Sequence, residues 1–230
     1  MTQGLILVRH GVTAWNREGR FQGHRDPPLA ADGLAQARLL AERIAADPEE
    51  RPVRIVSSPL ARAAQTARII AAALPGTARQ QEPDVALEPR LMEIGQGAWE
   101  GRTHAELART DARRYAAWRR DGGGRVPPGG EAVSAANTRV RAALGELLAG
   151  DEWPLCIVSH GGTLRLAARY LLGLEPRLAW EMDLDNASVS VISRADIEAT
   201  WQVRRWNDGA HLLGRSALHV DESEGEPLAL

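Results

Sequence analysis

The sequence of 230 residues contains no lysine, so all 28 of its basic residues are arginines. A chain without lysine can form neither a Schiff base with a carbonyl substrate nor the phosphate-binding lysine of a P-loop. If the protein binds a phosphate, the donors must therefore be guanidinium, imidazole or backbone N–H groups.

Cysteine is almost absent as well, because Cys156 is the one cysteine of the chain. A single thiol in an apolar run excludes a disulfide framework and a thiolate metal cluster, and we expect it to be buried and inert. The spacing between His24, His104, His211 and His219 is not that of metal ligands. No metal is therefore expected.

Long apolar runs and a large net charge are also missing. No run approaches the roughly 18 apolar residues that a membrane-spanning helix needs. The formal charge of −2 provides no basic surface for nucleic acid. The first residues lack the order of a signal peptide and lead directly into the apolar stretch Leu5–Val8. These absences predict a cytoplasmic protein without nucleic-acid or membrane partners, either a monomer or a homodimer.

The length and the hydrophobic content of 44% suit one domain with one substantial core. We expect this single domain to span residues 1–220. The remaining residues, 221–230, begin with the acidic stretch DESEGE and offer little to join a core. They are expected to form a disordered or loosely docked tail.

Short apolar runs alternate with longer segments of helical period, which is typical of an α/β domain. Strands are predicted over 5–8, 53–57 and 155–159, and helices over 33–46, 59–74, 131–149 and after Gly162. In the second helix, Ser58 and Pro59 have the character of an N-cap and a first helical residue. Near the end, 187–193 and 200–206 alternate as strands do, either as a hairpin or as neighbours at a sheet edge. The fold predicted is a three-layer α/β/α domain with a mostly parallel central sheet.

Residues 91–130 interrupt this alternation. They combine a loop punctuated by glycine, polar helical turns and a segment rich in glycine and proline at 121–130. We expect a small helical lid insertion over the site.

Polar residues follow three of the predicted strands. The first strand ends in Arg9 and His10, the second leads to Arg62, and the third ends in His160. Ligands of such a sheet bind outside the carboxyl ends of its strands, so these side chains should converge beside a helix N-terminus. Two guanidinium groups and two imidazoles at one place predict a site for a phosphoryl group.

These residue types suit phosphoryl transfer through a histidine. Planar guanidinium groups such as Arg9 and Arg62, with His160, can bind the phosphoryl oxygens as charge develops. Neighbouring cations disfavour the imidazolium and lower the pKa of His10 towards the nucleophilic neutral form. Glu93 is our candidate for the general acid that protonates the leaving oxygen.

The stretch LVRHGVTAWN at residues 7–16 resembles the signature of the histidine phosphatase superfamily, the phosphoglycerate mutase-like proteins. The likeness continues over nearly the whole chain. It includes RFQG at 20–23, SSPLARAAQTA at 57–67 and SHGG at 159–162. Val12 departs from the pattern, because glutamate or glutamine is common at this position, and the edge of the pocket could differ there.

The resemblance implies a role for each matching residue. It makes His10 the phosphorylated nucleophile and Glu93 the general acid and then the general base. The phosphate ligands that it implies are Arg9, Asn16, Arg62, His160 and the amide of Gly161. The neighbours that it implies on the substrate side are Thr13, Gln22 and Gly23.

Three functions remain open. The stretch EIGQGAWEG at 93–101 is similar to the short form in alpha-ribazole phosphatase and broad-specificity phosphatases. It favours a phosphomonoester hydrolase that acts on a small phosphorylated metabolite without a cofactor. The alternative is a cofactor-dependent phosphoglycerate mutase primed by 2,3-bisphosphoglycerate, although such mutases carry a longer insertion and a lysine in this region. A non-catalytic phospholigand-binding module would have little need for both His10 and Glu93.

Overall fold

A computed structural model describes residues 3–75, 85–120 and 125–213. The strands are β1 (Gln3–Arg9), β2 (Arg54–Ser57), β3 (Val85–Leu87), β4 (Leu155–Ser159), β5 (Val189–Arg194) and β6 (Gln202–Asp208). The α-helices are α1 (Ala14–Arg17), α2 (Ala31–Ala46), α3 (Ala61–Ala73), α4 (His104–Thr110), α5 (Ala112–Arg120), α6 (Val133–Leu147), α7 (Gly161–Leu172) and α8 (Pro176–Trp180). Short 3₁₀ turns are η1 (Pro89–Leu91), η2 (Gly97–Trp99) and η3 (Ala210–Leu212). Within these ranges, no helix is long and apolar enough to cross a membrane.

All six of these strands belong to one sheet, in the order β3-β2-β4-β1-β5-β6. The first four strands in this order are parallel, and Leu5 of β1 lies opposite Leu155 of β4. β5 runs antiparallel to β1, and β6 runs antiparallel to β5 at the edge. The prediction of a mostly parallel sheet is confirmed, and the two late strands are antiparallel neighbours at its edge.

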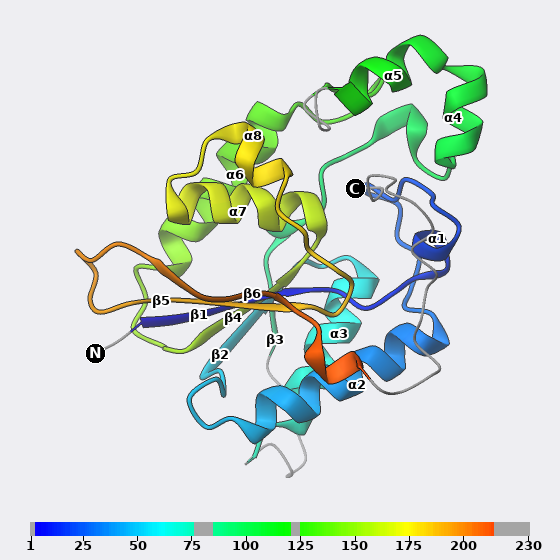
Figure 1. The fold of residues 1–230 in the computed structure, drawn as a ribbon. Coiled ribbons are helices and arrows are strands. Elements are labelled where there is room, and N and C mark those ends of the chain that lie inside the picture. The colour runs from blue at the N-terminus through cyan, green and yellow to red at the C-terminus, as the bar shows by residue number, and fades with distance from the viewer. Residues whose placement is uncertain (1–2, 76–84, 121–124, 214–230) are drawn as a thin grey trace.

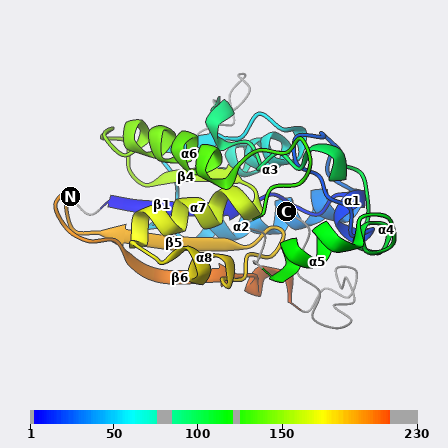
Figure 2. The ribbon, with the colours of Figure 1, turned by 90° about the horizontal axis from the view of Figure 1, so that it is seen from above.

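Alternating side chains of the sheet enter two separate cores. Leu5 and Leu7 of β1 pack with residues of α6 and α7, whereas Ile6 and Val8 pack with residues of α2 and α3. Successive side chains of a strand point to opposite faces, so a strand buried on both faces is apolar throughout. Figure 1 shows α6 and α7 on one side of the sheet and α2 and α3 on the other, and Figure 2 shows the molecule from the side of α6 and α7. The three-layer α/β/α fold is confirmed.

The start of α3 differs from the sequence-based expectation. Its N-cap is Leu60 rather than Ser58, and the first helical residue is Ala61 rather than Pro59. The Ser58 hydroxyl is engaged with His160, while the carboxylate of Asp26 accepts a hydrogen bond from the Ala61 amide at 2.6 Å. A residue distant in sequence therefore caps this helix, which no local pattern could indicate.

One further element was outside the expectation, whereas the helical turns expected between 91 and 130 are present. β3 was not predicted, because three residues at a sheet edge leave too short a pattern. Between 91 and 130 the chain contains η2, α4 and α5, which pack through the aromatic cluster Phe21, Trp99, Leu107, Tyr115 and Trp118. Residues 121–124 of the expected lid, and the expected acidic tail at 221–230, lie outside the described residues.

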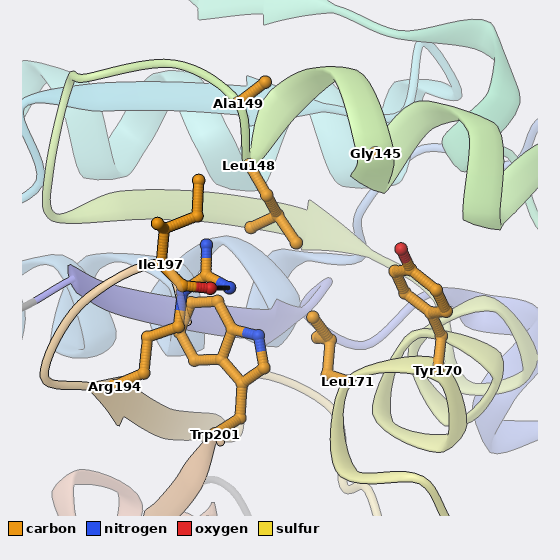
Figure 3. A pocket seen from close by; sticks show the side chains of 8 residues that line it. All are labelled: Gly145, Leu148, Ala149, Tyr170, Leu171, Arg194, Ile197 and Trp201. Carbon is orange, nitrogen blue, oxygen red and sulfur yellow. Dashed lines mark hydrogen bonds between the residues drawn. The ribbon is translucent and has the colours of Figure 1, made fainter. Parts of the chain in front are cut away.

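A hollow of about 360 Å³ lies between α6, α7 and the loop from β5 to β6. Figure 3 shows its lining, which includes Leu148, Tyr170, Arg194 and Trp201. These residues come from the C-terminal ends of α6 and α7 and from the β5–β6 connection. The hollow is therefore at the opposite end of the sheet from the carboxyl ends of the parallel strands.

Candidate active site

The carboxyl ends of β1 and β4 bring the two predicted histidines together. The two strands are parallel neighbours with Arg9 opposite Ser159, so the residues that follow, His10 and His160, emerge side by side. Their ring centroids are 5.1 Å apart, with the planes tilted by 60°. Both residues are almost completely buried.

A hydrogen bond fixes the tautomer of His10. The ring Nδ1 lies 2.7 Å from the carbonyl oxygen of Gly11. A carbonyl can only accept a hydrogen bond, so Nδ1 must carry the proton and donate it. When the ring is neutral, Nε2 therefore holds the free lone pair.

The surroundings favour the neutral form of both imidazoles. Burial lowers the pKa of His10 well below its usual value of 6.5, and the positive charges of Arg62 and Arg9 lower it further. The pKa of His160 is also well below its usual value, chiefly through burial and then through Arg62. The pKa of His10 is thus lowered as predicted, but burial is the largest cause and the arginines come second.

Arg62, at the start of α3, which follows β2, bonds to His160 at the end of β4. Its Nε donates to Nδ1 of His160 at 3.2 Å, and its terminal nitrogens donate to the carbonyl oxygens of Arg25 and Gly23. Because Nδ1 of His160 accepts, its Nε2 carries the proton, which is donated to the Ser58 hydroxyl at 2.8 Å. Burial lowers the pKa of Arg62 to about 10, which leaves it charged at neutral pH.

Arg9 has a second guanidinium group beside it. One nitrogen of Arg9 donates to the carbonyl oxygen of Leu184 at 2.5 Å, while its Nε is buried without a protein partner. Burial and the neighbouring Arg165 lower the pKa of Arg9 to about 10. A Cβ on Gly161 would lie 3.2 Å from Arg165 and 3.6 Å from Arg9, which places both guanidinium groups at the start of α7. Arg165 was not among the predicted site residues, although its position four residues after Gly161 puts it on the same helix face.

Glu93 lies at the N-terminus of α7. Its carboxylate accepts hydrogen bonds from the amides of Gly162 and Thr163 at 3.2 and 3.1 Å, and from its neighbour Ile94 at 2.9 Å. These helical amides have no partner within the helix and carry a partial positive charge, so they hold an anion well. The predicted acid and the predicted phosphate site therefore share one helix N-terminus.

The remaining predicted residues form a connected group next to the histidines. Thr13 caps α1, and its single hydroxyl proton has two acceptors within reach, the side-chain oxygens of Asn16 at 2.9 Å and of Gln22 at 3.2 Å. Gly23 follows with a positive φ of 50°, a conformation that favours glycine, and its carbonyl oxygen accepts from Arg62. The group is thus tied to Arg62 through the backbone of Gly23.

The site gathers hydrogen-bond donors and positive charge around one helix N-terminus. It combines three buried guanidinium groups, two neutral imidazoles, one carboxylate and the N-terminus of a 12-residue helix. Across the described ranges, no three or more His, Cys, Asp or Glu side chains are grouped to hold a metal ion. Fixed donors of this kind are suited to a phosphoryl group and to the charge that develops during its transfer.

Comparison with known proteins agrees with this geometry. Residues 5–209 match the family model of the histidine phosphatase superfamily (branch 1). A relative from Yersinia enterocolitica, named probable phosphoglycerate mutase GpmB, is 36% identical over 219 residues, which cover 90% of this chain and 94% of the relative. The protein of that name from Proteus mirabilis is 39% identical, over 88% of this chain and 89% of its own length.

Solved structures of similar fold include phosphatases. The alpha-ribazole phosphatase from Shigella flexneri is 32% identical, with a TM-score of 0.75, and the match covers 90% of this chain and 97% of that one. A mycobacterial glucosyl-3-phosphoglycerate phosphatase is 31% identical, with a TM-score of 0.75 over 89% of this chain and 99% of that one. The chain therefore belongs to the histidine phosphatase superfamily, branch 1.

Proposed function

We propose that the protein is a phosphomonoester hydrolase that works through a covalent phosphohistidine at His10. The observation that carries this proposal is the hydrogen bond from His10 Nδ1 to the Gly11 carbonyl. It leaves the Nε2 lone pair free in a neutral ring beside two arginines. A neutral, oriented imidazole next to fixed cations is what a nucleophile needs to attack a phosphoryl group.

In the first step, the lone pair of His10 Nε2 forms a bond to phosphorus. The bond from phosphorus to the ester oxygen breaks, and the leaving oxygen takes a proton from Glu93. The products of this step are the alcohol, the phosphohistidine and the Glu93 carboxylate.

In the second step, Glu93 acts as a base. It takes a proton from water, and the water oxygen attacks phosphorus while the bond from phosphorus to Nε2 breaks. The electron pair of that bond returns to His10. Inorganic phosphate leaves, and both residues are back in their starting states.

The other predicted residues have binding roles in this proposal. Phosphoryl oxygens would be bound by Arg9, Asn16, Arg62, His160 and the amide of Gly161. The substrate side would be bordered by Thr13, Gln22 and Gly23. The segment that contains α4 and α5 would act as a lid on a single catalytic domain spanning residues 1–220, and the substrate would be a small phosphorylated metabolite.

Replacement of the nucleophile tests the proposal directly. His10→Ala should lower kcat for p-nitrophenyl phosphate by a factor on the order of 10⁵, because loss of a nucleophile removes the covalent route. Arg141→Ala, an exposed arginine above Tyr170, is the control and should keep wild-type activity. Hydrolysis by His10→Ala at a rate near that of the wild type would refute the phosphohistidine mechanism.

A second function has a specific observation in its favour. The curated relatives at 36% and 39% identity are named as probable phosphoglycerate mutases. A mutase would use the same site and return the phosphoryl group to the substrate. Phosphorus NMR with 3-phosphoglycerate and a trace of 2,3-bisphosphoglycerate separates the two functions. Accumulating inorganic phosphate supports the hydrolase, and rapid formation of 2-phosphoglycerate with little free phosphate supports the mutase.

A further inference from the structure

The backbone around Glu93 has no regular structure to hold it. Residues 92–96 lie between η1 and η2 and belong to no helix or strand. Neither a helical nor a sheet ladder of hydrogen bonds therefore fixes this stretch. Buried backbone groups still require partners, so side chains from elsewhere must determine where Glu93 lies.

Arg139, on α6, is a partner of two backbone carbonyl groups of this stretch and of one just before it. One of its terminal nitrogens donates to the carbonyl oxygens of Arg90 and Met92 at 2.7 and 2.8 Å. The other donates to the carbonyl oxygen of Glu93 at 3.1 Å and to the carboxylate of Glu131 at 2.8 Å. Nε donates to Glu131 as well, at 2.7 Å. A guanidinium group has five N–H donors, so each of them has an acceptor here.

Glu131 binds the same segment on the C-terminal side of Glu93. Its carboxylate accepts a hydrogen bond from the Gly95 amide at 3.2 Å, so Arg139 and Glu131 bind the chain before, at and after Glu93. His24 adds a third contact, because its Nε2 donates to the Glu93 carbonyl oxygen at 2.9 Å. The side chains of Arg139 and Glu131 are only 19% and 18% exposed, which shields their ion pair from solvent.

We propose that Arg139, paired with Glu131, is the positioning residue that holds Glu93 at the place where it exchanges protons with the leaving oxygen and with water. The proposal rests on the general acid and base role proposed for Glu93. Arg139 donates to the backbone of the Glu93 segment, so it acts through the position of Glu93. A misplacement of about 1 Å in such a group can cost on the order of 100-fold in rate.

The test compares two esters that differ in their need for a general acid. Phenyl phosphate has a poor leaving group that must be protonated, whereas the leaving group of p-nitrophenyl phosphate is stable as an anion. Arg139→Ala should lower kcat/KM for phenyl phosphate by roughly 10- to 100-fold, and that for p-nitrophenyl phosphate much less. The inhibition constant of inorganic phosphate should change little, because the phosphate donors are untouched.

Conservative variants sharpen the test. A lysine ammonium is a point donor that cannot span three carbonyl groups and a carboxylate, so Arg139→Lys should restore only part of the selective loss. Glu131→Gln should lose activity in the same selective way. Arg141→Ala, a matched truncation two residues along the same helix, should behave as wild type with both esters. If Arg139→Ala fails to fold, Arg139→Lys and Glu131→Gln provide the same readout.

A double variant shows whether Arg139 acts through Glu93. In a Glu93→Gln background, Arg139→Ala should leave the ratio of the two kcat/KM values unchanged. Equal losses with both esters, or a weakened inhibition by phosphate, would show that Arg139 only supports the fold and would overturn the proposal. Failure of the proposed function is distinguishable, because wild-type protein would then hydrolyse neither ester or would do so without His10.

Discussion

At the residue scale, hydrogen bonds rather than an ion pair hold the carboxylate of Glu93. Its partners are amides of α7 and of the next residue, Ile94, and the start of α7 leaves almost no free space beside it. A Cβ on Gly162 would lie 2.7 Å from Glu93 Oε1 and 3.0 Å from a methyl group of Ile94. Glycine is therefore required here because of the space that the Glu93 carboxylate occupies. Its own backbone conformation does not require glycine, because it is helical.

Replacing Gly162 by alanine should displace Glu93 without damaging the helix. Alanine is a better helix former than glycine by about 0.8–1.0 kcal/mol, so the global stability should change little, while kcat falls by at least about 10-fold. Thermal unfolding and steady-state kinetics measure the two effects. Gly145→Ala is the control, because nothing lies within 4 Å of the new Cβ, and it should keep full activity. Equal activity in both variants would contradict the close contact.

The sequence predicted some site residues and missed others for one physical reason. Arg9, His10 and His160 directly follow strands, and the ends of parallel strands must meet. Arg165 and Ser58 enter the site through tertiary proximity, to Arg9 and to His160 respectively. Position relative to a strand can be read from a pattern, whereas contacts of this kind depend on the packed structure.

At the scale of elements, α4 and α5 share a small core with Phe21 and Trp99. It consists of five buried residues, and the one residue of α8 that packs against it, Trp180, is only partly buried. The two larger cores lie on the faces of the sheet and share no buried residue with this cluster. The α4–α5 segment can therefore open locally at a lower cost than the sheet.

Truncation of Trp118 should reveal this independence. Trp118 is buried between Phe21, Trp99 and Tyr115, and removal of such a ring costs about 3–5 kcal/mol. Hydrogen exchange of Trp118→Ala should be faster throughout α4 and α5 and unchanged in β1 and β4. Trp201→Ala, at the hollow on the opposite end of the sheet, should leave α4 and α5 protected. Faster exchange in β4 to the same extent as in α5 would show one cooperative unit instead.

At the scale of the whole molecule, the alternation of apolar runs predicted the layers but could not predict the order of the strands. Order and register depend on which strands pair, and the pairing of β1 with β4 joins residues about 150 positions apart. The same pairing buries two neutral histidines among cations. The stability of the fold is thereby linked to the protonation of its site.

This link predicts a loss of stability in mild acid. In the unfolded chain His10 and His160 bind protons near pH 6.5, while in the folded protein their lowered pKa values keep them neutral. At pH values between the folded pKa and 6.5, the unfolded state therefore binds more protons than the folded state. The free energy of unfolding is then fully retained above pH 6.5 and falls with decreasing pH, by up to about 1.4 kcal/mol per pH unit for each residue.

Urea denaturation from pH 5 to pH 7.5 measures this slope in a window above the titration of the carboxylates. The double variant His10→Gln/His160→Gln cannot bind these protons, so its free energy of unfolding should depend much less on pH than that of the wild type. His211, whose pKa burial also lowers, is present in both proteins and cancels in the comparison. An identical pH dependence in the two proteins would mean that the folded site tolerates imidazolium. In that case the fold would contribute nothing to the neutral state of His10 on which its attack at phosphorus depends.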